Sequence, residues 1–149
     1  MDPLTVSLTP SGGGVVETGT NSSVVTPVTP LYVPLVNVDD SPPIIGNFPT
    51  DPSGAARYVF AHDQVGATNL EINVDGHVTP IGAAYAAGPV ETPLPDGGSH
   101  IITVGAFLSP LSPGTHTITI SGLLDGLAFQ QVTGWSFLEF NFTYTVTVT

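Results

Sequence analysis

Apolar and polar residues alternate one by one along much of the chain, which is the pattern of half-buried β-strands. In EFNFTYTVTVT, the aromatic and β-branched side chains from Phe140 to Val148 alternate with Asn and Thr. THTITIS and GSHIITVGAFL also read as strands, and NLEINV leads into Asp75-Gly76, a pair typical of hairpin turns. TPLYVPLVNV is extended, and Pro30 and Pro34 indicate a sheet edge or a bulge.

Two further segments, ARYVFAHD and GLAFQQVTGWSFLEF, are interpreted as additional strands. The 15 prolines and 17 glycines leave no long window with helical periodicity. IGAAYAAG is the exception, because it fits one helical turn or a loop. The pattern therefore predicts an all-β fold, a single two-sheet β-sandwich of the Ig-like or jelly-roll kind, with about seven to nine short strands and an extended N-terminal strand.

The first 30 residues differ from the rest. Leu4, Val6 and Leu8 alternate with polar residues in a short strand-like segment, and SGGG follows it. We therefore divide the chain into an N-terminal extension, 1–30, and a β-sandwich domain, 31–149. An apolar strand on a glycine tether pairs with a neighbouring molecule or becomes an aggregation hazard. The alternatives are that it folds back as the first strand of its own sandwich or is a frayed terminus.

The charge balance excludes several kinds of partner. The chain has 12 acidic residues and one basic residue, Arg57, for a net charge of −11. Nucleic acids and anionic membrane surfaces need basic patches, so neither is a predicted partner. No stretch reaches the roughly 18–20 apolar residues of a membrane helix, so no membrane insertion is expected. The near absence of Lys and Arg removes sites for trypsin-like proteases and the mixed charges that keep monomers apart. Both features suit an extracellular or cell-surface assembly.

The histidines do not have the spacing of a zinc site. His116 shares its strand face with Ile118 and Ile120, which favours a boundary histidine that hydrogen-bonds a loop carbonyl over a metal ligand. The other three also do not form a motif; they are His62, His77 and His100.

Asp39-Asp40 is the densest acid pair. Paired carboxylates bind Ca²⁺ or act as general acid and base, but no D-x-D-x-D-G run accompanies them, and a solvated turn is favoured. The chain has no cysteine, no G-x-S-x-G elbow and no phosphate-binding loop. We therefore predict no catalytic residue, no metal site and no cofactor, and we do not expect an enzyme.

Aromatic side chains raise an alternative function. Tyr32, Tyr58, Tyr85 and Trp135 would stack on sugar rings if they lined an exposed face. That reading makes the chain a monomeric, secreted carbohydrate- or Ca²⁺-binding module, with a glycan as its partner. Aromatics that alternate in strands more often fill the core of a sandwich.

LSPGTHTI, from Leu111 to Ile118, resembles a strand start of immunoglobulin-like domains in bacterial surface and secreted proteins. With LYVPLVNV, VDGHVTPIGAAYAAGPVETPLP and FTYTVTV, it is similar to a set of uncharacterised secreted bacterial proteins over about residues 31–149. The resemblance implies a β-sandwich and export, although the N-terminus lacks the basic and apolar segments of a signal peptide. It implies no catalytic residues.

These observations predict a structural protein. Subunits would polymerise with copies of themselves into an extracellular fibre or surface layer, each donating Leu4–Leu8 to a neighbour's open sheet edge or groove. Leu4, Val6 and Leu8 are the predicted subunit contacts.

Overall fold

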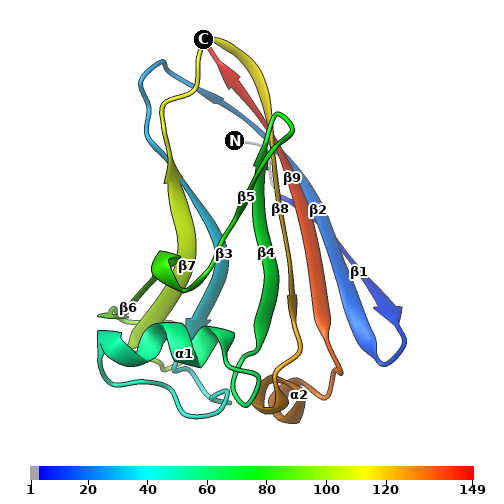
Figure 1. The fold of residues 1–149 in the computed structure, drawn as a ribbon, viewed down its shortest axis with the longest axis vertical. Helices are drawn as coiled ribbons and strands as arrows, with labels where there is room; N and C mark the ends of the chain where they lie inside the picture. Colours follow the sequence, from blue (N-terminus) through cyan, green and yellow to red (C-terminus); the bar gives the residue numbers. More distant parts are fainter. Residues whose placement is uncertain (1–3) are drawn as a thin grey trace.

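The computed structural model describes residues 4–149, and in it the chain forms two β-sheets that face each other (Figure 1). The expected all-β, two-sheet sandwich is therefore confirmed. The larger sheet has the strand order β1-β2-β9-β8-β4-β5. Its strands are β1 (Thr5–Ser11), β2 (Gly14–Val25), β4 (Ala67–Val74), β5 (His77–Pro80), β8 (Gly114–Leu124) and β9 (Leu138–Val148).

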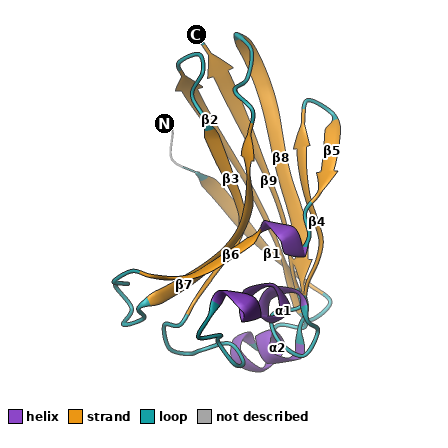
Figure 2. Cartoon of the chain, turned by 60° about the vertical axis from the view of Figure 1, so that its left-hand side comes forward, coloured by secondary structure: helices purple, strands orange, loops and turns teal. Residues whose placement is uncertain are grey.

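The smaller sheet has three strands in the order β3-β7-β6, with β3 at one edge (Figure 2). They are β3 (Leu31–Asp39), β6 (Ala86–Glu91) and β7 (His100–Leu108). The pairing of β3 with β7 shifts register between Pro34 and Val36. The proline prediction for TPLYVPLVNV is confirmed on both counts, because β3 is an edge strand and carries a bulge.

The core lies between the inner faces of the two sheets. Its largest fully buried side chains come from both sheets and from one end of the molecule, and they are Ile72, Ile102, Val104, Val59 and Val65. The predicted hairpin at Asp75-Gly76 joins β4 to β5, and both residues have positive φ, 51° and 91°. The paired positive φ values are those of the turns that suit the right-handed twist of hairpin strands.

Short helices close one end of the sandwich (Figure 1). They are η1 (Pro52–Gly54), α1 (Ala55–Phe60) and α2 (Leu127–Thr133), and a further short helix, η2 (Ala83–Tyr85), precedes β6. The strand predictions for ARYVFAHD and for the first half of GLAFQQVTGWSFLEF are therefore wrong. Of the two alternatives for IGAAYAAG, a helical turn or a loop, the structure has the helical turn, η2.

The sequence before α1 explains the error. Asp51 accepts a hydrogen bond from the Ser53 backbone N–H, and Pro52 occupies the first turn, which together make a helix start. The residues that α1 buries are Ala55, Tyr58 and Val59, at the i, i+3, i+4 spacing of a helix face. In so short a window these apolar residues fit either period.

The N-terminal segment belongs to the sandwich in this structure. β1 pairs antiparallel with β2 of the same chain, from Thr5 opposite Thr20 to Ser11 opposite Gly14. The glycine tether is a two-residue hairpin turn, with φ of 53° at Gly12 and 85° at Gly13. β2 then pairs parallel with β9 along its length. Residues 5–25 are thus part of the larger sheet and not an extension separate from residues 31–149. The N-terminal strand folds back on its own sandwich, which was one of the alternatives considered for it.

Candidate functional site

The inner face of the larger sheet is uncovered along its β1 edge. Val6 lies opposite Gly19, and Gly19 lies opposite Phe142, which is partly buried and packs against the core, so Val6 faces the same way as the core. All seven residues of β1 are nevertheless exposed. Leu4, Val6 and Leu8 are 42%, 44% and 59% exposed. The three predicted contact residues therefore form an apolar strip, Leu4–Leu8, that the three-stranded sheet does not reach.

A groove of about 320 Å³ lies between this strip and the edge strand β3. Its lining is mainly apolar and comes from both sheets; the residues are Leu4, Asn21, Ser23, Leu31, Tyr32, Val33, Pro34, Ile118, Tyr144 and Val146. Leu4 is the member of the strip that lines the groove. β3 pairs with β7 on one side, and its other edge borders the groove. The structure thus places an apolar strand and an open sheet edge on opposite sides of one groove.

The turn between β1 and β2 is fixed to the loop before β9. The Ser136 N–H donates to the Gly13 carbonyl, and the Val15 N–H donates to the Phe137 carbonyl, both at 3.0 Å. The Phe137 ring lies against Gly14, where a Cβ would come within 2.4 Å of the ring. Residues 13–15 are therefore anchored, whereas the strip beyond them is held by its pairing with β2.

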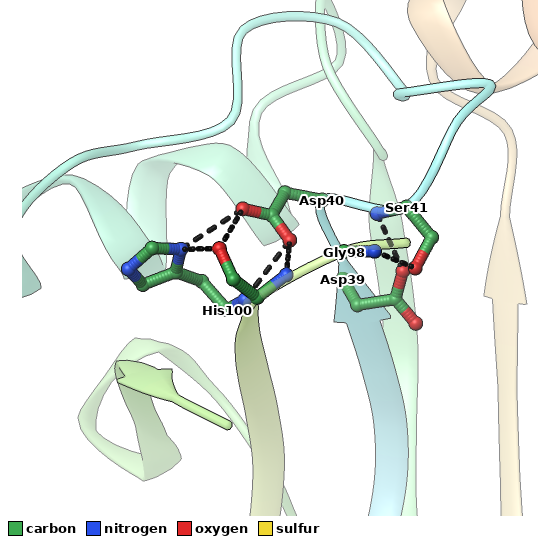
Figure 3. Close-up of polar contacts among 6 residues, drawn as sticks. Asp39, Asp40, Ser41, Gly98 and His100 are labelled. Atoms are coloured by element: carbon green, nitrogen blue, oxygen red, sulfur yellow. Dashed lines mark hydrogen bonds and ion pairs between the residues drawn. The ribbon is translucent and has the colours of Figure 1, made fainter. Parts of the chain in front are cut away.

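The acid pair Asp39-Asp40 forms a clamp between strands (Figure 3). One oxygen of Asp40 accepts the backbone N–H of Ser99 at 2.7 Å and that of His100 at 2.9 Å. The hydrogen bond from the His100 backbone is the main cause that lowers the pKa of Asp40 to about 2. Asp39 instead accepts the backbone N–H of Ser41 at 2.8 Å. Asp40 thus ties the end of β3 to the start of β7, whereas Asp39 holds the local turn at Ser41.

This cluster contains Ser, His and Asp but not in the arrangement of a nucleophilic triad. Ser99 Oγ and Asp40 Oδ2 each lie 2.9 Å from the same ring nitrogen, His100 Nδ1. A triad histidine takes the proton of the nucleophile on one ring nitrogen and is oriented through the other. The observed geometry stabilises a loop and does not activate the Ser99 hydroxyl.

His116 occupies the boundary position that the sequence predicts. Its Nε2 lies 2.8 Å from the Ser112 carbonyl oxygen, so the expected bond to a loop carbonyl is confirmed. Its Nδ1 lies 2.6 Å from Asp75 Oδ2. Both ring nitrogens face acceptors, so the protonated imidazole donates to both, and the hydrogen bond to Asp75 raises the pKa of His116. The same bond lowers the pKa of Asp75, whose other oxygen accepts the Thr117 N–H at 2.8 Å.

Two further pairs of opposite charge lie at the surface. Arg57 and Asp63 approach to 3.0 Å, and His62 Nδ1 lies 3.9 Å from Asp125. His77 is exposed at the start of β5. Within the part of the chain that the structure describes, no group of three or more His, Cys, Asp or Glu side chains is placed to hold a metal ion.

The four aromatic residues considered for sugar stacking do not share one face. Tyr58 is buried, its hydroxyl donates to the Ile45 carbonyl at 2.7 Å, and burial raises its pKa to about 12. Tyr85 and Trp135 are partly exposed, in η2 and after α2. Tyr32 lies on β3 beside Phe107 of β7, with ring centroids 5.0 Å apart.

Phe107 is the exposed aromatic that sequence reasoning missed, and it is 76% exposed. Strand parity could have identified it. Ile102 and Val104 of β7 point into the core, so the odd-numbered Phe107 belongs to the outer face.

Of the helices in residues 4–149, none is long and apolar enough to span a bilayer. Comparison with protein-family models, with curated proteins and with solved structures finds no significant match. Function must therefore be inferred from the residues of this chain.

Proposed function

We propose that the protein is a structural subunit of an extracellular fibre or surface assembly, in which the β1 strand of one copy adds to an open sheet edge of the next. The observation that carries the proposal is the exposed apolar strip Leu4–Leu8 beside the groove at β3. The finer fold assignment, Ig-like or jelly-roll, and the likeness to secreted bacterial proteins belong to the same proposal.

The strip supports strand addition energetically. Main-chain hydrogen bonds to a neighbour would supply affinity, and alternate side chains would supply fit. Leu4, Val6 and Leu8 are each roughly half exposed, so covering them would contribute on the order of 1 kcal/mol per side chain. A contact between different surfaces of two copies continues into a filament when it does not close into a ring.

The edges themselves support the same proposal. Natural edge strands are commonly protected by charged side chains, especially Lys, that oppose further pairing. The sequence of β1, TVSLTPS, contains no charged residue. Its neighbour β2 contains one, Glu17. All seven residues of the edge strand β1 are thus exposed. Pro10 is the residue in it that opposes pairing with a further strand.

The hinge for such an exchange would be Gly12–Gly13. Residues 13–15 keep their bonds to Ser136 and Phe137 while β1 separates from β2, so the sandwich loses one edge strand and no core residue. In the assembly a neighbour's β1 would cover the groove, either beside β2 or at the free edge of β3.

Removal of residues 1–11 tests the proposal. This deletion takes away β1 and retains the anchor at residues 13–15. We expect the full chain to assemble and the truncated chain to remain monomeric in electron microscopy and size-exclusion chromatography. Assembly of the truncated chain to the same extent would show that strand donation is wrong.

A disulfide lock distinguishes donation from simple contact of folded subunits. Ser7 and Thr18 are exposed register partners on β1 and β2, and the chain has no cysteine of its own. We expect the oxidised Ser7→Cys/Thr18→Cys protein to remain monomeric and to assemble after reduction. The matched control is Thr119→Cys/Thr143→Cys, which joins β8 to β9 in the same way and leaves β1 free. A locked hairpin that still assembles would refute exchange of β1.

A further inference from the structure

The outer face of the smaller sheet carries an exposed aromatic platform made of Tyr32 and Phe107. The two residues are register partners on β3 and β7. Their ring centroids are 5.0 Å apart, and their planes meet at 54°. Phe107 is 76% exposed although it lies in a regular strand. Large apolar side chains exposed together on a sheet face are a mark of an interaction surface.

The platform is held in place by its own strand neighbours. The Tyr32 hydroxyl lies 2.9 Å from Thr103 Oγ1, which fixes the direction of the ring. Gly105 lies between them on β7, and a Cβ at this position would come within 2.7 Å of the Tyr32 hydroxyl and 2.8 Å of its ring. The ring therefore lies across Gly105, and a larger residue there would lift it. Such fixed aromatic rings lose little conformational freedom on binding.

Polar groups continue this face along the same two strands. Asn37 is exposed and is the register partner of Thr103, so an amide and a hydroxyl follow the aromatic pair. The single Lys or Arg residue of the protein, Arg57, is on α1 and pairs with Asp63. With a net charge of −11 and no cation on this face, the surface does not suit phosphate, sulfate or carboxylate ligands.

We propose that this surface, Tyr32–Phe107 with Asn37 and Thr103, binds a neutral saccharide. The apolar face of a pyranose ring would stack on the exposed Phe107 ring, with the inclined Tyr32 ring at its edge, and its hydroxyls would bond to the amide and hydroxyl beside it. This site does not depend on strand addition. Tyr32 also lines the groove at β3, but Phe107 does not, so Phe107 separates the two functions experimentally.

The test titrates the full chain with uncharged hexasaccharides of β-glucan, α-glucan and chitin, and with an acidic hyaluronan hexasaccharide. Binding is measured by calorimetry and by NMR of the amides of Thr103 and Gly105. We expect at least one uncharged probe to bind, and Phe107→Ala to weaken it at least about tenfold. We expect Tyr32→Phe, which retains the ring and loses the bond to Thr103, to weaken it less.

The control variants are Tyr85→Ala and Trp135→Ala, because each removes an aromatic residue elsewhere that is 38% exposed, close to the 39% of Tyr32. Both should bind the probe as the unchanged chain does, and Phe107→Ala should keep its melting temperature. The proposal is overturned if no uncharged probe binds at millimolar concentration, if Phe107→Ala binds normally, or if the acidic probe alone binds. It is also overturned if Phe107→Ala abolishes self-association without changing saccharide binding, which would identify a contact between copies.

Discussion

The inner face of the larger sheet is covered at β4 and β8 and uncovered at the edge strand β1. In one row across the sheet, Ile72 of β4 and Ile120 of β8 are 2% and 4% exposed, because the smaller sheet covers them. The row continues through Phe142 and Gly19 to Val6, which is 44% exposed. We call β4 and β8 the closed side and β1 the open side.

Alternation of apolar and polar residues determines which side chains share a face of a strand, but not whether that face is buried. A strict period of two places Ile118 and Ile120 on one face, and it does the same for Leu4, Val6 and Leu8. Whether that face becomes core depends on where the other sheet lies. After residue 25 the chain crosses to the smaller sheet, whose three strands are too few to cover six. The open side is thus a core face without a partner.

The largest difference is expected between two substitutions that remove the same number of carbon atoms, one in the core and one on the open side. Ile102→Ala removes a fully buried side chain and should lower the free energy of unfolding by about 2–5 kcal/mol. Leu8→Ala removes a side chain that is 59% exposed and should cost less than about 1 kcal/mol. Urea denaturation of the monomer measures both values. Equal losses would mean that the open side is covered in solution.

Much of the sandwich was predictable because the signals of its strands are local. The alternation in β7, β8 and β9 is regular, and the Asp75-Gly76 pair predicts the hairpin between β4 and β5. The helix α1 was not predicted, because a largely apolar stretch of six residues is too short to separate the helical period from the strand period, and only the Asp51-Pro52 start distinguishes them.

The candidate sites depended on contacts that no local pattern encodes. Asp40 and His100 meet across 60 positions, and His116 and Asp75 across 41. Spacing in the sequence cannot report such pairs. The groove at β3 depends in addition on the difference in size between the sheets, which becomes visible only when the strand order is known.

A smaller effect is expected at Gly19, where the two sides meet. A Cβ there would lie 2.5 Å from the Phe142 ring and 2.9 Å from the Thr5 carbonyl oxygen. Gly19→Ala should therefore lower the free energy of unfolding by about 1–3 kcal/mol through overpacking. The control is Gly82→Ala, because a Cβ at Gly82 meets no atom within 4 Å. Its effect should stay within about 0.5 kcal/mol. Urea denaturation of both variants decides the point, and a neutral Gly19→Ala would mean that Phe142 repacks freely.

The smallest effect is expected from the hydrogen-bonded pair His116–Asp75, which joins two strands of the closed side. The side-chain hydrogen bonds and ion pairs described in this structure include none from residues 5–11, whereas His116 ties β8 to Asp75 at the end of β4. The pKa of His116 is raised above its ordinary 6.5, so the pair stabilises the fold fully below pH 6.5. Its contribution is lost as the pH rises through the raised pKa. The pKa of Asp75 is lowered below its ordinary 3.8, so the contribution of that carboxylate is lost on the acid side instead.

We therefore expect the melting temperature of the unchanged chain to fall as the pH rises above 6.5. In His116→Gln this fall should be smaller, and the melting temperature below pH 6.5 should be lower than in the unchanged chain. His62→Gln is the control, because His62 is exposed and lies 3.9 Å from its acidic neighbour. It should keep the dependence of the unchanged chain. Thermal denaturation across this pH range measures all three proteins. The same fall in all of them would mean that the bond between His116 and Asp75 does not stabilise the closed side.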